Sequence, residues 1–126
     1  MGEVQVYKIG DHQIELAFRD GIAPASPYSL LLAGSMPKLP GQTVGDLGTG
    51  CGILAIVACL QGAKRVYLLD SCDKAIGLAL ENARRNGVES GLVDLPTGDS
   101  MLPLPEGEWV DSRKPISGEP IFHLQT

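Results

Sequence analysis

The sequence has few features of a secreted or membrane-bound protein. Its three cysteines, Cys51, Cys59 and Cys72, form no C-x-x-C pair and have no histidine at metal-ligand spacing, which argues against structural zinc and favours a reducing compartment. The longest apolar stretch, residues 52–60, has about half the length of a membrane-spanning helix, and the N-terminus lacks the basic start and apolar run of a signal peptide. We therefore expect a cytoplasmic protein that makes no contact with a membrane.

Positive charge is also scarce. Ten Lys and Arg residues stand against fifteen Asp and Glu residues, so the formal net charge is -5. A protein that coats nucleic-acid phosphates normally carries the opposite sign. We expect no DNA-binding patch, and any contact with nucleic acid should be local.

The length and composition are those of one folded domain. The chain has 126 residues, of which 44% are hydrophobic, too many for a disordered protein, and its 16 Gly and 9 Pro fall below the share of a low-complexity sequence. Residues 1–36 should form an N-terminal unit, with a hairpin turning at Gly10 and a helix that is capped by Ser26 and runs to about Ala33, where Gly34 ends it.

Strands and helices alternate over residues 37–111, which we interpret as the cofactor-binding core. The run at residues 65–70 is almost continuously apolar, as expected for a strand whose two faces are both buried in a parallel sheet. The order predicts an α/β fold, a Rossmann-like parallel sheet with flanking helices, preceded by the N-terminal β-hairpin. The expected strands are residues 43–47, 65–70 and 91–95, and the expected helices run from 52 to 60 and from about 73 to 86.

The C-terminal segment, residues 112–126, is atypical for this pattern. Its strand candidate at residues 121–124 fits a late edge strand, and a shorter candidate precedes the segment at residues 109–110. A doubly wound domain normally has more strands than this chain offers. We therefore expect an incomplete sheet, with an uncovered edge that favours self-association.

The strongest functional signal is the stretch Gly45–Gly52, where an acid at Asp46 is followed by alternating glycines. Alternating glycines let the backbone turn tightly and approach a ligand, and free amides at the next helix N-terminus favour an anionic group. A P-loop lysine is absent, and Ile53 stands where a dinucleotide fingerprint requires glycine. A shifted register starting at Gly50 still fits a looser dinucleotide form, so an NAD(P)-dependent oxidoreductase remains an alternative.

A second signal is Asp70, which ends the second expected strand 22 positions after Gly48. A carboxylate in this place can accept hydrogen bonds from ribose hydroxyls. Both signals belong to the carboxyl ends of neighbouring strands, where sheets of this kind bind ligands.

At these residues the chain resembles the class I S-adenosylmethionine-dependent methyltransferases. Residues 46–55 are similar to their first motif, and the resemblance continues through residues 66–70 and 81–87 to 98–100, covering roughly residues 20–111. Within that family, the sequences of these motifs are most similar to those of enzymes that methylate nitrogens of release factors, ribosomal proteins or ribosomal RNA. The resemblance implies S-adenosylmethionine as cofactor and a protein or RNA as methyl acceptor.

The resemblance also implies roles for single residues around that cofactor. Carboxylates are electrostatically favourable near its cationic sulfonium. It assigns Asp46 to the ammonium group, Gly48 and Gly50 to the methionine part, Asp70 to the ribose, Asp99 to the adenine amino group, and Cys72 to the neighbourhood of the adenine ring.

One family feature is missing. In the nitrogen-methylating relatives the fourth strand runs into Asn-Pro-Pro, which holds the target nitrogen, and this chain contains no Asn-Pro-Pro. We therefore assign no catalytic residue. A catalytically silent S-adenosylmethionine-binding module that needs a partner is a second alternative.

Other polar residues have simpler structural interpretations. We expect Arg84 and Arg85 on the solvated face of a helix, and His12 on the surface or at an edge. Cys51 and Cys72 are most simply interpreted as small buried thiols.

Overall fold

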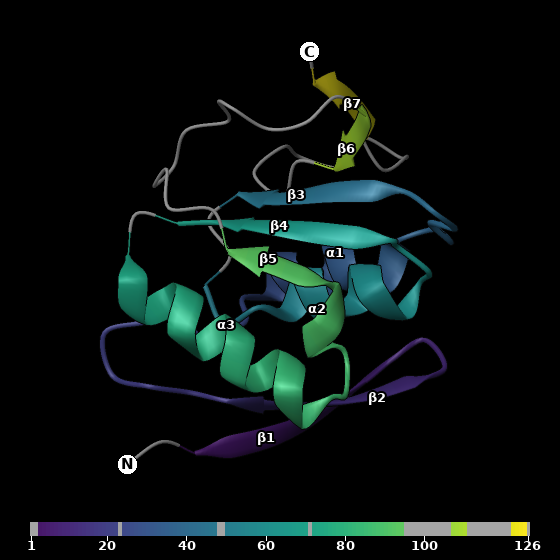
Figure 1. The fold of residues 1–126 in the computed structure, drawn as a ribbon. Coiled ribbons are helices and arrows are strands. Elements are labelled where there is room, and N and C mark those ends of the chain that lie inside the picture. The colour runs from purple at the N-terminus through teal and green to yellow at the C-terminus, as the bar shows by residue number, and fades with distance from the viewer. Residues whose placement is uncertain are drawn as a thin grey trace.

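The computed structural model describes residues 3–22, 24–47, 50–70, 72–94, 107–110 and 122–125. These residues form a parallel sheet, a layer of helices on one face of it, and an antiparallel hairpin beneath the helices (Figure 1). The elements are β1 (Val4–Ile9), β2 (His12–Ala17), α1 (Pro27–Ser35), β3 (Thr43–Leu47), α2 (Ile53–Leu60), β4 (Arg65–Leu69), α3 (Asp73–Arg85), the 3-10 turn η1 (Glu89–Gly91), β5 (Leu92–Asp94), β6 (Gly107–Val110) and β7 (Phe122–Gln125).

The central sheet confirms the predicted fold class. Strands β3, β4 and β5 lie in that order and pair in parallel, with α2 and α3 as the connections between them. Val66 and Leu68 of β4 are fully buried, as the apolar pattern of this strand predicted. Among the described residues the parallel sheet has these three strands, which agrees with the expected incomplete sheet.

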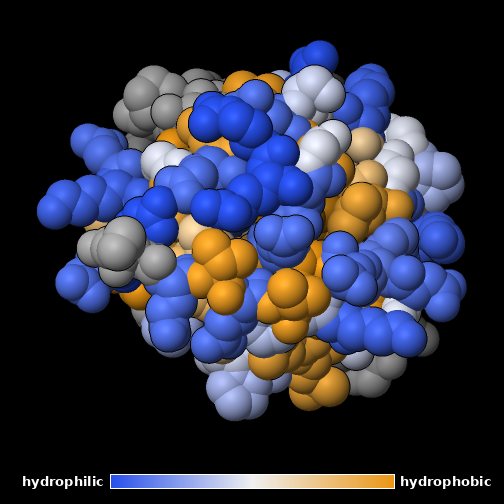
Figure 2. All heavy atoms as spheres, turned by 90° about the horizontal axis from the view of Figure 1, so that it is seen from below, coloured by the Kyte–Doolittle hydropathy of each residue, from blue (hydrophilic) through white to orange (hydrophobic). Residues whose placement is uncertain are grey.

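The N-terminal hairpin covers the helices from the side opposite the sheet. Ile14 and Leu16 of β2 are fully buried at period two, and β2 packs against α3. The outer strand β1 exposes 44% of Val4 and 58% of Val6. Figure 2 shows the face on which the hairpin lies, with hydrophobic patches between hydrophilic residues. The hairpin thus contributes one face to the core and leaves a mixed face to solvent.

Helix α1 begins as predicted and ends slightly later. The Ser26 side chain accepts a hydrogen bond from the Ser29 amide, and Pro27 occupies the first turn. The helix continues through Gly34 to Ser35, two residues beyond the expected end at about Ala33. The stop is set at Met36, which is extended because it precedes Pro37.

The two C-terminal strands pair with each other. Strand β6 lies beside β3, and β7 pairs with β6 in antiparallel register, from Gly107 opposite Gln125 to Val110 opposite Phe122. Strand β7 is therefore the expected late edge strand, shifted by one residue.

None of the helices in the described ranges is long and apolar enough to cross a membrane.

Candidate cofactor-binding site

Two carboxylates belong to the carboxyl-terminal parts of neighbouring strands in the central sheet. Asp46 lies in β3 opposite Leu68 of β4, and Asp70 follows β4 directly. Asp46 is 2% exposed, while Asp70 is half-buried. The parallel register alone therefore brings both carboxylates to the edge where such sheets bind ligands.

The carboxylate of Asp70 is bonded to the glycine loop. Its Oδ2 accepts a hydrogen bond from the Gly50 amide at 3.2 Å, and its Oδ1 accepts one from the Cys72 amide at 2.9 Å. Each carboxylate oxygen can accept more than one hydrogen bond, so Asp70 retains capacity for ligand hydroxyls. The structure thus joins the two sequence signals, the glycine loop and the acid after the second strand.

The loop glycines serve two different purposes. Gly50 and Gly52 have positive φ angles of 54° and 91°, which favour glycine. A Cβ atom on Gly52 would lie 2.9 Å from both Cα and Cβ of Ala79 in α3. Gly52 is therefore needed for close packing of the loop on a helix, and Gly50 lies on the side of the loop that Asp70 contacts.

Burial makes two of the thiols, those of Cys51 and Cys59, harder to ionise. Cys51 is buried, and that burial, together with the nearby charge of Asp46, raises the pKa of its thiol. Burial raises the pKa of the Cys59 thiol to about 11. Cys72 is half-buried just before α3. Cys51 thus behaves as the small buried thiol that was expected.

The sequence matches one family model over residues 16–106, which include β3, β4, β5 and both carboxylates. The model is that of ribosomal protein L11 methyltransferase (PrmA). The chain belongs to this family. The family match confirms the resemblance to methyltransferases.

Individual relatives support this membership. The L11 methyltransferase of Chloroflexus aurantiacus is 38% identical over 112 residues, covering 88% of this chain and 34% of the relative, and that of Alteromonas mediterranea is 43% identical, covering 88% and 36%. The crystal structure of protein arginine methyltransferase 10 from Arabidopsis thaliana is 29% identical over 63% of this chain and 24% of that chain, with a TM-score of 0.52. The chain spans about a third of the length of the two curated L11 methyltransferases.

Within this methyltransferase chain, two of the expected site residues lie outside the described residues. These are Gly48 and Asp99. The structure joins Gly50, Asp70 and Cys72 through the two hydrogen bonds of the Asp70 carboxylate, and it places Asp46 in the strand beside β4. The ligand roles of Asp46, Gly50, Asp70 and Cys72 remain predictions.

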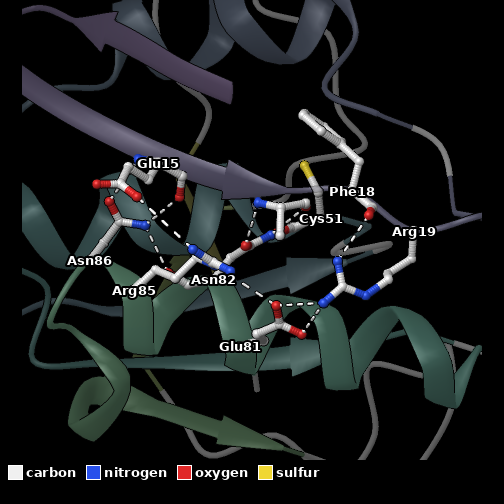
Figure 3. Close-up of polar contacts among 9 residues, drawn as sticks. Glu15, Phe18, Arg19, Cys51, Glu81, Asn82, Arg85 and Asn86 are labelled. Carbon is white, nitrogen blue, oxygen red and sulfur yellow. Dashed lines mark hydrogen bonds and ion pairs between the residues drawn. The ribbon is translucent and has the colours of Figure 1, made fainter. Parts of the chain in front are cut away.

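The sequence interpretation missed the polar residues that join the methyltransferase core to the hairpin. Asn82 of α3 is fully buried and bonds both to β2 and to the glycine loop (Figure 3). Arg19, which follows β2, bonds both carboxylate oxygens of Glu81 at 2.8 and 2.7 Å. The sequence did contain a signal for these contacts, namely the i, i+4 spacing of Asn82 and Asn86 on the apolar side of the helix.

Two other expectations have mixed outcomes. Arg84 and Arg85 are exposed, as predicted for a solvated helix face. His12 is half-buried, and its Nε2 lies 3.0 Å from Oε1 of Gln61, so it is part of the contact between the hairpin turn and the end of α2. That contact joins residues 49 positions apart, which sequence spacing does not reveal.

Proposed function

We propose that this chain binds S-adenosylmethionine and acts as the cofactor-binding part of a methyltransferase that modifies a nitrogen of a protein. The observation that carries the proposal is the Asp70 carboxylate bonded to the Gly50 amide, with the buried Asp46 carboxylate on the neighbouring strand. Membership of the L11 methyltransferase family favours a ribosomal protein over RNA as the methyl acceptor.

The residues present fit this cofactor chemically. When bound, S-adenosylmethionine would supply an electrophilic methyl carbon, to which a nitrogen bonds as the carbon–sulfur bond breaks and S-adenosylhomocysteine leaves. Asp70 would accept hydrogen bonds from the ribose hydroxyls, and the Asp46 carboxylate would offset the positive ammonium and sulfonium charges. Gly50 would let the loop backbone approach the methionine part. The remaining assignments are Gly48 beside Gly50, Asp99 at the adenine amino group and Cys72 beside the ring.

The organisation of the chain follows from these assignments. Residues 37–111 would form the cofactor-binding core, with residues 1–36 and 112–126 as flanking segments. A cytoplasmic location is proposed because three unpaired cysteines and a ribosomal acceptor both suit a reducing compartment that contains ribosomes.

Calorimetry tests the choice of cofactor. We expect the chain to bind S-adenosylmethionine or S-adenosylhomocysteine more tightly than NAD, because Ile53 replaces the glycine of the dinucleotide fingerprint while the acid precedes the loop. All three ligands would be titrated under identical conditions. Tighter binding of NAD would contradict the proposal and support the oxidoreductase alternative.

Methyl transfer tests whether cofactor binding is sufficient for activity. We expect the 126-residue chain to transfer label poorly from S-adenosylmethionine to ribosomal protein or to a whole-cell extract. The reason is that no Asn-Pro-Pro segment aligns a nitrogen with the methyl carbon, and alignment accounts for several kcal/mol of barrier lowering. Robust transfer by a monomer, with light scattering as the measure of size, would contradict both this prediction and the expected self-association.

A further inference from the structure

Asn82 occupies a central position between three parts of the fold. It lies on α3 one turn after Ala79, and its side chain is 0% exposed. Its Nδ2 donates to the carbonyl of Cys51 at 2.8 Å and to the carbonyl of Ala17 at 3.1 Å, while its Oδ1 accepts from the Ala17 amide at 2.7 Å. Both amide hydrogens are therefore used, one of them toward the glycine loop.

Asn86 provides an internal comparison one helical turn later. Its Oδ1 accepts from the Glu15 amide at 3.0 Å, and its Nδ2 donates to the Glu15 carbonyl at 2.8 Å. Glu15 and Ala17 present their backbone groups on the edge of β2 that faces away from β1. The two asparagines thus bond this edge in the same way, but Nδ2 of Asn86 makes its other bond within α3, to the Asn82 carbonyl at 2.7 Å (Figure 3).

The bond from Asn82 fixes the carbonyl of Cys51, the residue between Gly50 and Gly52 of the loop. Gly52 has a φ of 91° and no side chain, and it lies directly against Ala79. Because the carbonyl and amide of a trans peptide point in opposite directions, drawing the Cys51 carbonyl toward Asn82 turns the Gly52 amide away from α3. The same peptide lies one residue after Gly50, whose amide bonds Asp70. The orientation of this loop segment is therefore set partly from α3.

We propose that Asn82 is a positioning residue for the cofactor site, which holds the glycine loop in its binding conformation and couples it to the N-terminal hairpin. This inference rests on the proposed function. Asn82 acts through the loop backbone, because the hydrogen bonds of its side chain are made to backbone groups of Ala17 and Cys51. Only an asparagine at this position supplies two donors and one acceptor at this reach.

The test compares Asn82→Ala with Asn86→Ala in the full chain. Both variants lose the bonds to β2, so both should lower the melting temperature. Only Asn82→Ala should weaken binding of S-adenosylhomocysteine, by roughly tenfold or more, because a buried carbonyl of the loop loses its partner. Hydrogen exchange of the amides in residues 50–53 should accelerate in Asn82→Ala and not in Asn86→Ala.

Binding and exchange are measured at a temperature where circular dichroism shows each variant folded. If Asn82→Ala does not fold, Asn82→Leu takes its place, since it keeps a side chain of similar size but has no hydrogen to donate to the Cys51 carbonyl. Equal S-adenosylhomocysteine affinities for the position-82 variant and Asn86→Ala would overturn the inference. Failure of the unmodified chain to bind S-adenosylhomocysteine would instead overturn the proposed function, so the two failures are distinguishable.

Discussion

Replacement of Asp70 by alanine is expected to weaken S-adenosylhomocysteine binding by about 2 to 4 kcal/mol, or roughly 30- to 1,000-fold. The substitution removes the proposed acceptor for two ribose hydroxyls. It also removes the bonds to the amides of Gly50 and Cys72, which hold the loop against the end of β4. Calorimetry measures the loss. Asp99→Ala should cost less, because Asp99 is assigned a single contact with the adenine amino group.

Asp73→Ala is the matched control for Asp70→Ala. Asp73 is an exposed carboxylate three residues later, in the first turn of α3. Its removal should lower stability by at most about 1 kcal/mol through the helix dipole and leave S-adenosylhomocysteine affinity unchanged. If folded Asp70→Ala binds S-adenosylhomocysteine like the unmodified chain, the assignment of Asp70 to the ribose is wrong.

Replacement of Gly52 by alanine is expected to lower the free energy of unfolding by about 2 to 4 kcal/mol. A residue with a side chain is strained at a φ of 91°, and its Cβ would lie 2.9 Å from the Cα of Ala79, which is backbone and cannot rotate away. Urea denaturation measures the change through the transition midpoint. The loop would have to withdraw from α3, so ligand affinity should fall as well.

Gly77→Ala is the opposite case on the same helix. Gly77 lies in the middle of α3, away from both ends, and is exposed to solvent. A Cβ atom there would meet nothing within 4 Å. Alanine should therefore raise stability by about 0.5 to 1 kcal/mol through helix propensity. For Gly52→Ala, an unfolding midpoint in urea equal to that of the unmodified chain would show that the loop and α3 are not packed as described.

Local patterns were sufficient to predict most of the elements. The strand over residues 65–69 was recognised because burial of both its faces makes the run almost continuously apolar, and the N-terminal hairpin was recognised from its turn at Gly10. The end of α1 was misplaced by two residues because Pro37 stops the helix through Met36, and Gly34 is accommodated inside it.

The candidate site was predictable only in part. Parallel strands place their carboxyl ends together, so the proximity of Asp46 and Asp70 follows from their positions in the sequence. The bond between Asp70 and the Gly50 amide depends on how the loop turns, which spacing alone does not specify.

The sequence by itself determined the α/β order, the glycine turn and the acids at the strand ends, because these depend on side-chain periodicity and on backbone freedom within a few residues. Tertiary structure decided the roles of Asn82 and Gly52. Asn82 finds its partners 65 and 31 positions away, and Gly52 is required by contact with Ala79. A buried amide must be hydrogen-bonded and a close contact must exclude a side chain, but the partner in each case is chosen by packing between distant segments.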